Sequence, residues 1–238
     1  MDQHFKRLTN GLDVLKLDVP KSFTLAFFRK EILRLTGSKK EARVRFTAFR
    51  GNGGLYTPVS DQLNFLITAS KLQQPSYSFP SKGLKTITFS RIPLTFSVLS
   101  SIKTMNSLPY VLAAKQKKIL NIDDLVLLNN SGRVSEASSS NIVIWNGKTL
   151  ITPSLKEACI AGIIRSVLLE RIADTGLKIK EKKVTIDDLN SAKAVFLTNS
   201  IQGVKWVRKF ETRSYDKKVA KQVGKILIEV LNTEACRD

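Results

Sequence analysis

One lysine, Lys103, differs from the chain's other basic residues in its surroundings. It follows the apolar run "IPLTFSVLSSI" and precedes a helix start, within "SSIKTMNSLPYVLAAKQ" at residues 100–116. This order predicts a lysine at the end of a buried strand. Burial lowers the pKa of a lysine amine and frees its lone pair, which suits the amine to Schiff-base chemistry with an aldehyde.

Three other features could act together with such an amine. Glu136 lies between two apolar strands, just after a turn, in "GRVSEASSSNIVIW". Gly162 opens a helix in "EACIAGIIRS", and free backbone N–H groups at a helix start bind phosphate. The apolar strand "VFLTNSIQG" ends in small polar residues that can form an anion-binding turn. Each feature alone is more often a surface glutamate, a tight turn or a routine strand end.

One cofactor has chemical groups that would bind to all four features. Its aldehyde would react with the lysine, its pyridine nitrogen would pair with a carboxylate, and its phosphate would bind backbone N–H groups. That cofactor is pyridoxal 5'-phosphate. The interpretation depends on the combination, because the spacing alone does not define the cofactor.

The composition is that of a globular protein with an unusual charge. The chain has 238 residues, 42% of them hydrophobic, and a formal net charge of +19. This length supports one large core or two smaller ones. The charge would attract anionic small molecules, nucleic acid or acidic membranes. No zinc-finger spacing, RNP-like aromatic motif or arginine-rich tail accompanies it, so a solvated lysine-rich surface is favoured over nucleic-acid binding.

Histidine and cysteine are too few for several kinds of site. The one histidine, His4, leaves little material for a histidine triad or a multi-histidine metal site. Cys159 and Cys236 have no metal or redox spacing, and a disulfide between them stays an open alternative. So few cysteines favour a reducing compartment. The start of the chain has no apolar targeting core, and no run reaches membrane-spanning length. We expect a cytoplasmic protein without a metal site or a membrane partner.

Apolar periodicity predicts two helices and two strands in the first part of the chain. The first helix covers "HFKRLTNGLDVLKL", and the second begins near Pro20–Ser22 and ends at Gly37. The strands are "ARVRFTAFRG" and "LNFLITASKL", with the turn "GNGG" after the first. The first helix has four apolar residues at helical spacing, which are Phe5, Leu8, Leu12 and Leu15.

The second part of the chain is richer in short strands. "LKTITFSRIPL" predicts a strand, and "NSLPYVLAAKQKKIL" predicts a helix with Asn106 as its N-cap and Pro109 in its first turn. The short strands "DLVLLNN", "SNIVIWN" and "TLITP" follow, with turns at "SGR" and Gly147. The amphipathic helix "AGIIRSVLLERIADTG" then ends at Gly176.

The last elements complete an α+β pattern. "KIKEKKVTI" and "KAVFLTNS" predict strands around a short helix that Asp187 could cap. The segregation of strands and helices predicts a mainly antiparallel sheet. Residues 73–83, rich in proline and serine, predict a linker between a domain at 1–78 and a larger domain at 79–238. The final helix, "YDKKVAKQVGKILIEVLN", has an apolar stripe of Val219, Val223, Ile226, Val230 and Leu231.

Six segments in order also carry a family resemblance. They are "HFKRL", "RGNGGLY", "IKTMNSLPYVLA", "GRVSEASSSNIVIWNGKTLITPSL", "AGIIR" and "FLTNSIQGV", and together they extend over nearly the whole chain. In order and spacing they resemble the class IV aminotransferases, the fold-type-IV pyridoxal-phosphate enzymes. The resemblance implies the two-domain α+β fold of D-amino-acid aminotransferases, with a small N-terminal α/β domain and a larger domain that binds the cofactor. It also implies an amino-acid-like substrate and a homodimer.

The resemblance assigns roles to individual residues. Lys103 corresponds to the lysine that binds the cofactor, and Glu136 to the partner of its pyridine nitrogen. Arg7 matches the family's phosphate-binding arginine, and Ile160 falls where the family places an apolar residue against the ring. Backbone N–H groups for the phosphate would come from Ile163 and Ile164 on one side and from Ser200 and Ile201 on the other.

The implied mechanism leaves the reaction open. The substrate amine displaces Lys103, the ring held by Glu136 accepts electrons, and the freed lysine moves the substrate α-proton. We favour aminodeoxychorismate lyase activity, because "TNSIQG" lacks the Gly-Thr turn followed by Glu of branched-chain and D-amino-acid aminotransferases. One alternative is an aminotransferase of branched-chain or D-amino acids that uses 2-oxoglutarate. The other is a non-catalytic relic or basic binding protein on the same fold. Relatives have opening strands before the "HFKRL" helix, so we expect a small domain that is incomplete relative to the family.

Overall fold

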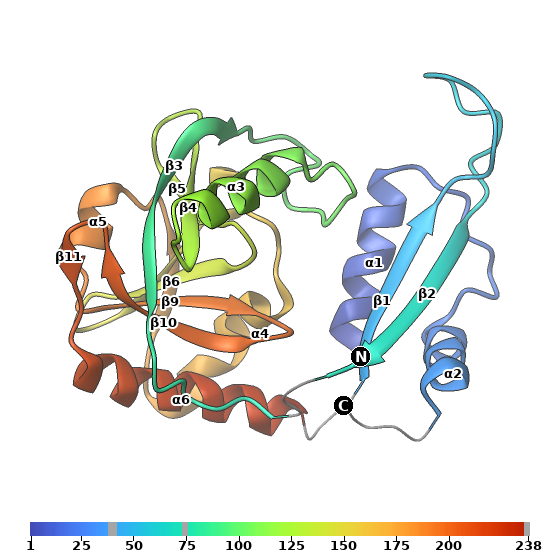
Figure 1. Ribbon diagram of the computed structural model, residues 1–238. Coiled ribbons are helices and arrows are strands. Elements are labelled where there is room, and N and C mark those ends of the chain that lie inside the picture. The colour runs from blue at the N-terminus through green and yellow to red at the C-terminus, as the bar shows by residue number, and fades with distance from the viewer. Residues whose placement is uncertain (38–41, 73–75, 236–238) are drawn as a thin grey trace. The chain divides into compact units, whose positions relative to one another are not determined.

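The structure is a computed structural model that describes residues 1–37, 42–72 and 76–235. The chain divides into two compact units, Met1–Pro75 and Ser76–Arg237. Their helices and strands are labelled in Figure 1. The domain boundary expected at residue 78 falls inside the second unit, close to its start.

The first unit combines two helices with a two-stranded antiparallel sheet. The helices are α1 (Asp2–Val14) and α2 (Leu25–Thr36), and the strands are β1 (Ala42–Phe49) and β2 (Asn64–Lys71). All four elements contribute side chains to one apolar cluster. Aromatic rings dominate this cluster, and the rings of Phe46 and Phe65 stack with their centroids 5.0 Å apart.

The local sequence explains where these two helices begin and end. Phe5, Leu8 and Leu12 of α1 belong to the apolar cluster, which confirms the predicted face of this helix. The prediction that α2 begins near Pro20–Ser22 is wrong. The helix begins after Thr24, because the Thr24 side chain accepts a hydrogen bond from a backbone N–H of the first turn and so caps it. It ends at Gly37 as predicted.

The second unit contains one nine-stranded sheet within the described residues. The strand order is β5-β4-β3-β10-β9-β6-β7-β8, and β11 pairs with β10. The pairs are antiparallel except β3–β4, β3–β10 and β7–β8, which confirms a mainly antiparallel sheet. The strands are β3 (Leu84–Leu94), β4 (Asp124–Asn129), β5 (Val134–Ala137), β6 (Asn141–Trp145), β7 (Leu150–Pro153), β8 (Ile179–Lys182), β9 (Ala194–Asn199), β10 (Gly203–Phe210) and β11 (Arg213–Ser214).

Three of these strands were not predicted from the sequence. β5 is only four residues long, and β11 only two, so neither shows a period. β10 carries Lys205, Arg208 and Lys209 among its apolar residues, and these charges interrupt the apolar pattern by which a strand is predicted. The consequence for the site is that Glu136 lies within a strand, β5, and not in the connection between two strands.

The helices of the second unit follow the predicted pattern with different caps. Ser107, not Asn106, is the N-cap of α3, and Pro109 lies in the first turn as predicted. Thr185, not Asp187, caps α5, because its side chain and that of Asp188 form a reciprocal capping box. The elements are α3 (Leu108–Ile119), α4 (Ile163–Arg171), α5 (Ile186–Ser191), α6 (Lys217–Ala235) and the 3-10 turns η1 (Leu155–Glu157) and η2 (Ile172–Thr175). The helix predicted to run to Gly176 is therefore α4 followed by η2.

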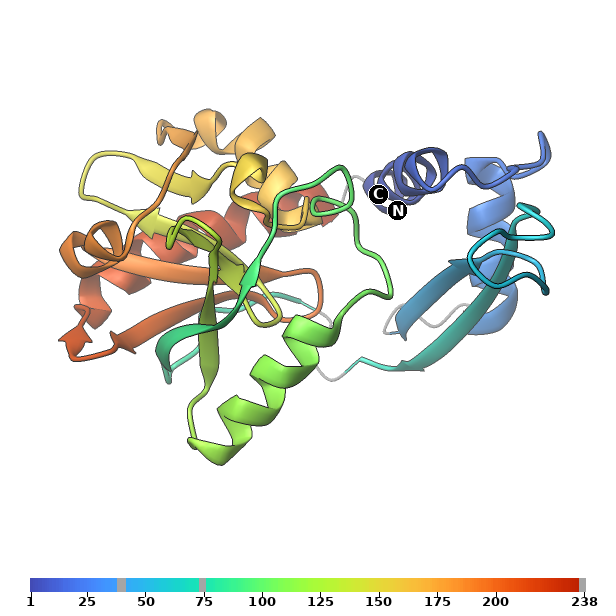
Figure 2. The ribbon, with the colours of Figure 1, turned by 90° about the horizontal axis from the view of Figure 1, so that it is seen from above.

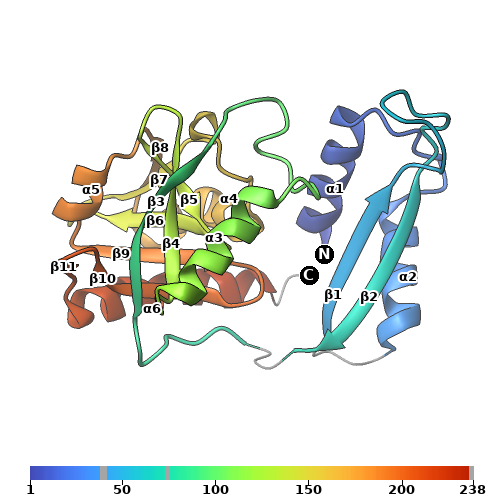
Figure 3. The same ribbon diagram turned by 45° about the horizontal axis from the view of Figure 1, so that its top comes forward.

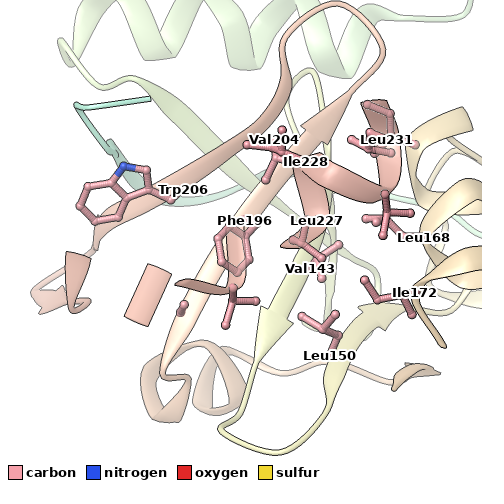
Figure 4. Packing of buried hydrophobic residues seen from close by; sticks show 14 of the residues in the cluster. Val143, Leu150, Leu168, Ile172, Phe196, Val204, Trp206, Leu227, Ile228 and Leu231 are labelled. Carbon is pink, nitrogen blue, oxygen red and sulfur yellow. The ribbon is translucent and has the colours of Figure 1, made fainter. Parts of the chain in front are cut away.

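The main core lies where α4 and α6 cover β6, β9 and β10 (Figure 4). Phe196 of β9 and Leu227 of α6 are fully buried there. Val223, Val230 and Leu231 are buried as well, so the stripe predicted for α6 is confirmed and extends to Leu227. On the opposite side, α3 runs alongside β3 and β4 and closes a smaller core (Figure 3).

The described part of the predicted linker is packed against the second unit. The ring of Phe79 stacks on Trp206, and the indole Nε1 of Trp206 donates to the Pro80 carbonyl at 3.0 Å. The Tyr77 hydroxyl donates to the Ser200 carbonyl at 2.8 Å. The two units divide at Pro75/Ser76, within the predicted linker, and two aromatic anchors, Tyr77 and Phe79, attach the part that follows to the second unit. Residues 73–75 lie outside the described residues.

Candidate active site

Lys103 lies in the connection between β3 and α3. β3 ends at Leu94, and residues 95–107 form a series of turns that leads into α3 (Figure 2). The prediction that Lys103 ends a buried strand is wrong, because Lys103 is exposed in this connection. Leu94, the last residue of β3, is buried, but the apolar residues after it are exposed, with Phe96 at 58% and Val98 at 77%. The positive charge of Lys103 nevertheless lowers the pKa of Glu136, so the amine lies within electrostatic range of the carboxyl group.

Glu136 is the buried acid of this site. It is only 3% exposed and pairs with Leu127 across β5 and β4. Its Oε1 accepts a hydrogen bond from the Tyr110 hydroxyl at 2.6 Å. Its Oε2 accepts from Nδ2 of Asn141 at 3.1 Å and from the backbone N–H of Ile160 at 3.2 Å. Both oxygens are therefore held by groups from three separate segments.

Burial and the neighbouring groups shift the pKa of Glu136 in opposite directions. Burial raises the pKa of Glu136 from 4.5 to about 7, because the charged form loses its water. The hydrogen bonds from Tyr110 and Ile160, and the charges of Lys103 and Arg165, oppose that rise. The carboxyl group therefore changes its charge near neutral pH, which is common for groups at functional sites.

Asn141 connects Glu136 to the start of α4. Besides Glu136, its Nδ2 donates to the Ile160 carbonyl at 2.8 Å, and the N–H of Gly162 donates to the same carbonyl at 2.9 Å. A Cβ atom at Gly162 would collide with Oδ1 of Asn141, so only glycine fits this close approach. The turn 160–162 thus brings the backbone of Ile160 next to the carboxylate. The role of the Ile160 side chain against the cofactor ring stays a prediction.

The beginning of α4 is suited to an anion. Gly162 is its N-cap and provides no side-chain cap, so the first-turn N–H groups of Ile163 and Ile164 have no side-chain acceptor from that residue. The helix dipole adds a partial positive charge at this end. Arg165, in the same turn, is buried and donates to the Pro153 carbonyl at 3.0 Å. The phosphate role of the two isoleucines stays a prediction.

The turn between β9 and β10 is organised by Asn199. Its Oδ1 accepts from the N–H groups of Ile201 at 3.0 Å and Gln202 at 2.8 Å. Its Nδ2 donates to Oγ of Ser140 at 3.0 Å. The N–H of Ile201, expected to bind phosphate, is thus engaged by a side chain in this structure. Its role, and that of Ser200, stay predictions that require this N–H to be shared or released.

The remaining expectations concern single residues. Arg7 lies on α1 in the first unit, whereas the other predicted site residues belong to the second unit, and its phosphate role stays a prediction. Cys159 is buried, and burial raises its pKa to about 12, so its thiol stays neutral. Cys236 lies outside the described residues. Within the described ranges, no group of three or more His, Cys, Asp and Glu side chains could hold a metal ion, and no helix is long and apolar enough to cross a membrane.

Two site residues were missed by sequence reasoning. Tyr110 and Asn141 both bind Glu136, but one lies in a helix and the other at the start of a strand. Asn141 gave a signal, because it is a polar residue at the head of the apolar segment "NIVIW". Tyr110 gave none, since an aromatic residue in an amphipathic helix is usually part of the core.

The residues present fit pyridoxal phosphate. The fit depends on a buried carboxylate held by three donors, a lysine near enough to act on its charge, and an uncapped helix start tied to it through Asn141. These are the groups that a pyridine nitrogen, an aldehyde and a phosphate require.

Comparison with known proteins gives the family. The model of the family "Amino-transferase class IV" matches residues 1–210. A candidate branched-chain-amino-acid aminotransferase of Methanocaldococcus jannaschii is 27% identical over 228 residues, covering 95% of this chain and 77% of that protein. The chain belongs to the class IV aminotransferase family, and it is an enzyme of that family, as the sequence resemblance implied.

Solved structures show the same fold. The structure of a candidate 4-amino-4-deoxychorismate lyase from Legionella pneumophila matches with a TM-score of 0.83 at 20% identity, covering 97% of this chain and 84% of that one. The pyridoxal-phosphate-bound form of a hypothetical aminotransferase from Mycobacterium tuberculosis matches with a TM-score of 0.80 at 18% identity, covering 98% and 84%. The expected fold-type-IV α+β architecture is confirmed.

Proposed function

We propose that this protein is a pyridoxal-phosphate-dependent aminotransferase that acts on branched-chain amino acids. The observation that carries the proposal is Glu136, a buried carboxylate whose two oxygens are both held and whose charge is influenced by Lys103. The choice of substrate is supported by the similarity to the Methanocaldococcus jannaschii protein. It replaces the lyase activity that the sequence alone favoured.

Different residues of the chain would bind the cofactor and transfer the substrate proton. Lys103 would hold the cofactor through its Nζ atom, and the same atom would accept and return the substrate α-proton. Glu136, when ionised, would accept a hydrogen bond from the protonated ring nitrogen. The bound cofactor supplies an electron-withdrawing ring. The backbone at Ile163, Ile164, Ser200 and Ile201 would hold the phosphate, and Ile160 would pack against the ring. The family resemblance also gives Arg7 a phosphate role.

A coupled assay tests the reaction. Purified protein is loaded with pyridoxal phosphate and given leucine, isoleucine or valine with 2-oxoglutarate. We expect glutamate and the matching branched-chain 2-oxo acid to form in equal amounts. The variant Lys103→Ala should form neither, because it lacks the amine that moves the α-proton. Absence of transfer by cofactor-loaded wild-type protein would overturn the proposal.

A second candidate is 4-amino-4-deoxychorismate lyase activity. Its support is the turn after β9, where Asn199 binds the N–H groups of Ile201 and Gln202 in place of the Gly-Thr turn of typical aminotransferases. The same protein is incubated with 4-amino-4-deoxychorismate, and p-aminobenzoate and pyruvate are measured. Formation of both products without amino transfer would establish this candidate over the first.

We also propose that the chain forms a homodimer, by likeness to the family. Exposed apolar residues on α3 support this proposal, since Leu108 is 69% exposed, Val111 47% and Leu112 44%. Sedimentation equilibrium of the purified protein checks it, and a monomer at all concentrations would contradict it. Salt-sensitive retention of nucleic acid by a protein without cofactor absorbance would instead support a non-catalytic basic binding protein.

A further inference from the structure

Tyr110 connects the helix after Lys103 to the buried acid of the site. It lies in the first turn of α3, and its half-buried ring packs against the core that includes Phe89 and Leu125. From there its hydroxyl reaches Oε1 of Glu136 at 2.6 Å. The ring is fixed by apolar packing, so the position of the hydroxyl is set by the helix and not by the carboxylate alone.

The hydrogen bonds to Glu136 leave one place for a further donor. A carboxylate has about four acceptor positions, two on each oxygen. Oε2 accepts from Asn141 and Ile160, and both of its positions are therefore used. Oε1 accepts from the Tyr110 hydroxyl, and a carboxylate oxygen can take a second donor beside it. A donor added to this carboxylate must share Oε1 with Tyr110.

The proton between Tyr110 and Glu136 belongs to the tyrosine. Burial and the charge of Glu136 raise the pKa of Tyr110 far above its usual value, whereas Glu136 ionises at about 7. The other charged groups acting on Glu136 are Lys103 from the connection and Arg165 from α4. The Cys159 thiol nearby is neutral, because burial and the charge of Glu136 raise its pKa. The two cations favour the anion at a distance, and Tyr110 favours it by direct contact.

We propose that Tyr110 is a positioning residue for the cofactor, whose hydroxyl keeps Glu136 ionised and fixes Oε1 as the atom that receives the pyridine N–H. This inference rests on the proposed function, because it concerns the same carboxylate. It adds a residue that touches neither substrate nor cofactor and acts through Glu136. The substitution Tyr110→Phe removes the hydroxyl and keeps the ring in the core.

The test is the affinity for pyridoxal phosphate at two pH values. Loss of a hydrogen bond to a charged group should raise the pKa of Glu136 by about one to two units. Only the ionised fraction binds tightly, and the apparent Kd rises as this fraction falls. We therefore expect Y110F to weaken binding about 5- to 50-fold at pH about 7 and about twofold or less at pH about 9. The titration of the free cofactor is the same for both proteins and cancels in the ratio.

A matched control separates this effect from general loss of stability. Tyr215 is buried in the same unit, and its hydroxyl donates to the Leu189 carbonyl at 2.8 Å, away from Glu136. Y215F removes one buried tyrosine hydroxyl, as Y110F does. Its affinity ratio to wild type should be the same at both pH values. A pH-dependent loss in Y215F equal to that in Y110F would overturn the inference.

A measurement without cofactor gives an independent readout. The ¹³C chemical shift of the Glu136 carboxyl, followed by NMR through a pH titration, should show the midpoint moving up by about one to two units in Y110F. An unchanged midpoint, or an affinity ratio that does not vary with pH while wild type binds cofactor, overturns this inference alone. Absence of cofactor binding by wild-type protein overturns the proposed function and this inference together.

Discussion

At the scale of single residues, the site is built around a carboxyl group that folding removes from water. Glu136 would lose much free energy if its charge were left alone in the interior. Tyr110, Asn141 and the Ile160 N–H replace the lost water by direct hydrogen bonds. The compensation is partial, because the pKa still rises to about 7. A positively charged group that binds next to Glu136 would therefore favour ionisation of its carboxyl group.

The raised pKa of Glu136 predicts a specific pH dependence of stability. Between pH 4.5 and about 7 the folded state keeps a proton that the unfolded state has released. The free energy of unfolding contributed by Glu136 therefore falls as pH rises through this window and is level above it. Relative to Glu136→Gln, wild type should lose up to about 3 kcal/mol across the window. Urea unfolding at several pH values checks this, and a relative gain with rising pH would show that the pKa is lowered instead.

Lys103 makes a second prediction at this scale. Protein reconstituted with pyridoxal phosphate should show the visible absorbance of the cofactor joined to a lysine, and Lys103→Ala should abolish it. Lys115→Ala is the control, because Lys115 is an exposed lysine on the neighbouring α3. Absorbance that survives in K103A and is lost in another lysine variant would assign the attachment elsewhere.

Sequence reasoning found the residues whose chemical type is unusual for their place. Lys103 and Glu136 were singled out because a charged group beside apolar strands requires an explanation. Tyr110 was not, because its role appears only when α3 packs against β3 and β4 and the hydroxyl reaches Glu136 on β5. The burial of Lys103 was wrongly inferred, because β3 ends at Leu94 and the rest of the apolar run, from Phe96 to Leu99, is exposed loop.

At the scale of elements, the turn 160–162 joins the acid to the helix start. Asn141 on β6 donates to both Glu136 and the Ile160 carbonyl, and it lies against Gly162 without space between them. The strand, the turn and α4 thus hold one another in place. The periodicity of the sequence predicted the strand and the helix, but not the close contact between them, because such contacts depend on tertiary packing.

This contact predicts the effect of Gly162→Ala. The added methyl group collides with the Asn141 side chain, and overpacking of this kind costs about 1–3 kcal/mol. Displacement of Asn141 should also weaken cofactor binding. In an Asn141→Ala background the collision is absent, so the same glycine substitution should cost much less. Equal costs in both backgrounds, measured by urea unfolding, would contradict the contact.

At the scale of the whole molecule, the net charge of +19 is the dominant feature. The strongly basic chain is expected to attract small anions, and both pyridoxal phosphate and 2-oxo acids are anionic. Polar and charged residues also cover the outer strand β8, where three of four residues are exposed. Charged side chains on an edge strand discourage pairing with other chains.

The charge predicts a salt-dependent rate of cofactor association. Raising the salt concentration from about 0.01 M to about 0.1 M shortens the Debye length from about 30 Å to about 10 Å. The association rate constant of pyridoxal phosphate, measured by stopped-flow absorbance, should then fall by a factor of about 3 to 10. Pyridoxal, which lacks the phosphate, is the control and should respond less. Equal responses of the two compounds would rule out steering by the phosphate charge.

The position of β10 has a consequence for synthesis of the chain. In the sheet, β10 lies between β3 and β9, yet it is made after both. Until residues 203–210 leave the ribosome, β3–β4–β5 and β9–β6–β7–β8 are two separate sheets, each with an unpaired edge open to aggregation. Glu136 belongs to one of them and Asn141 to the other. We therefore expect that a nascent chain stalled before Gly203 binds no cofactor and depends on chaperones until β10 joins the two sheets.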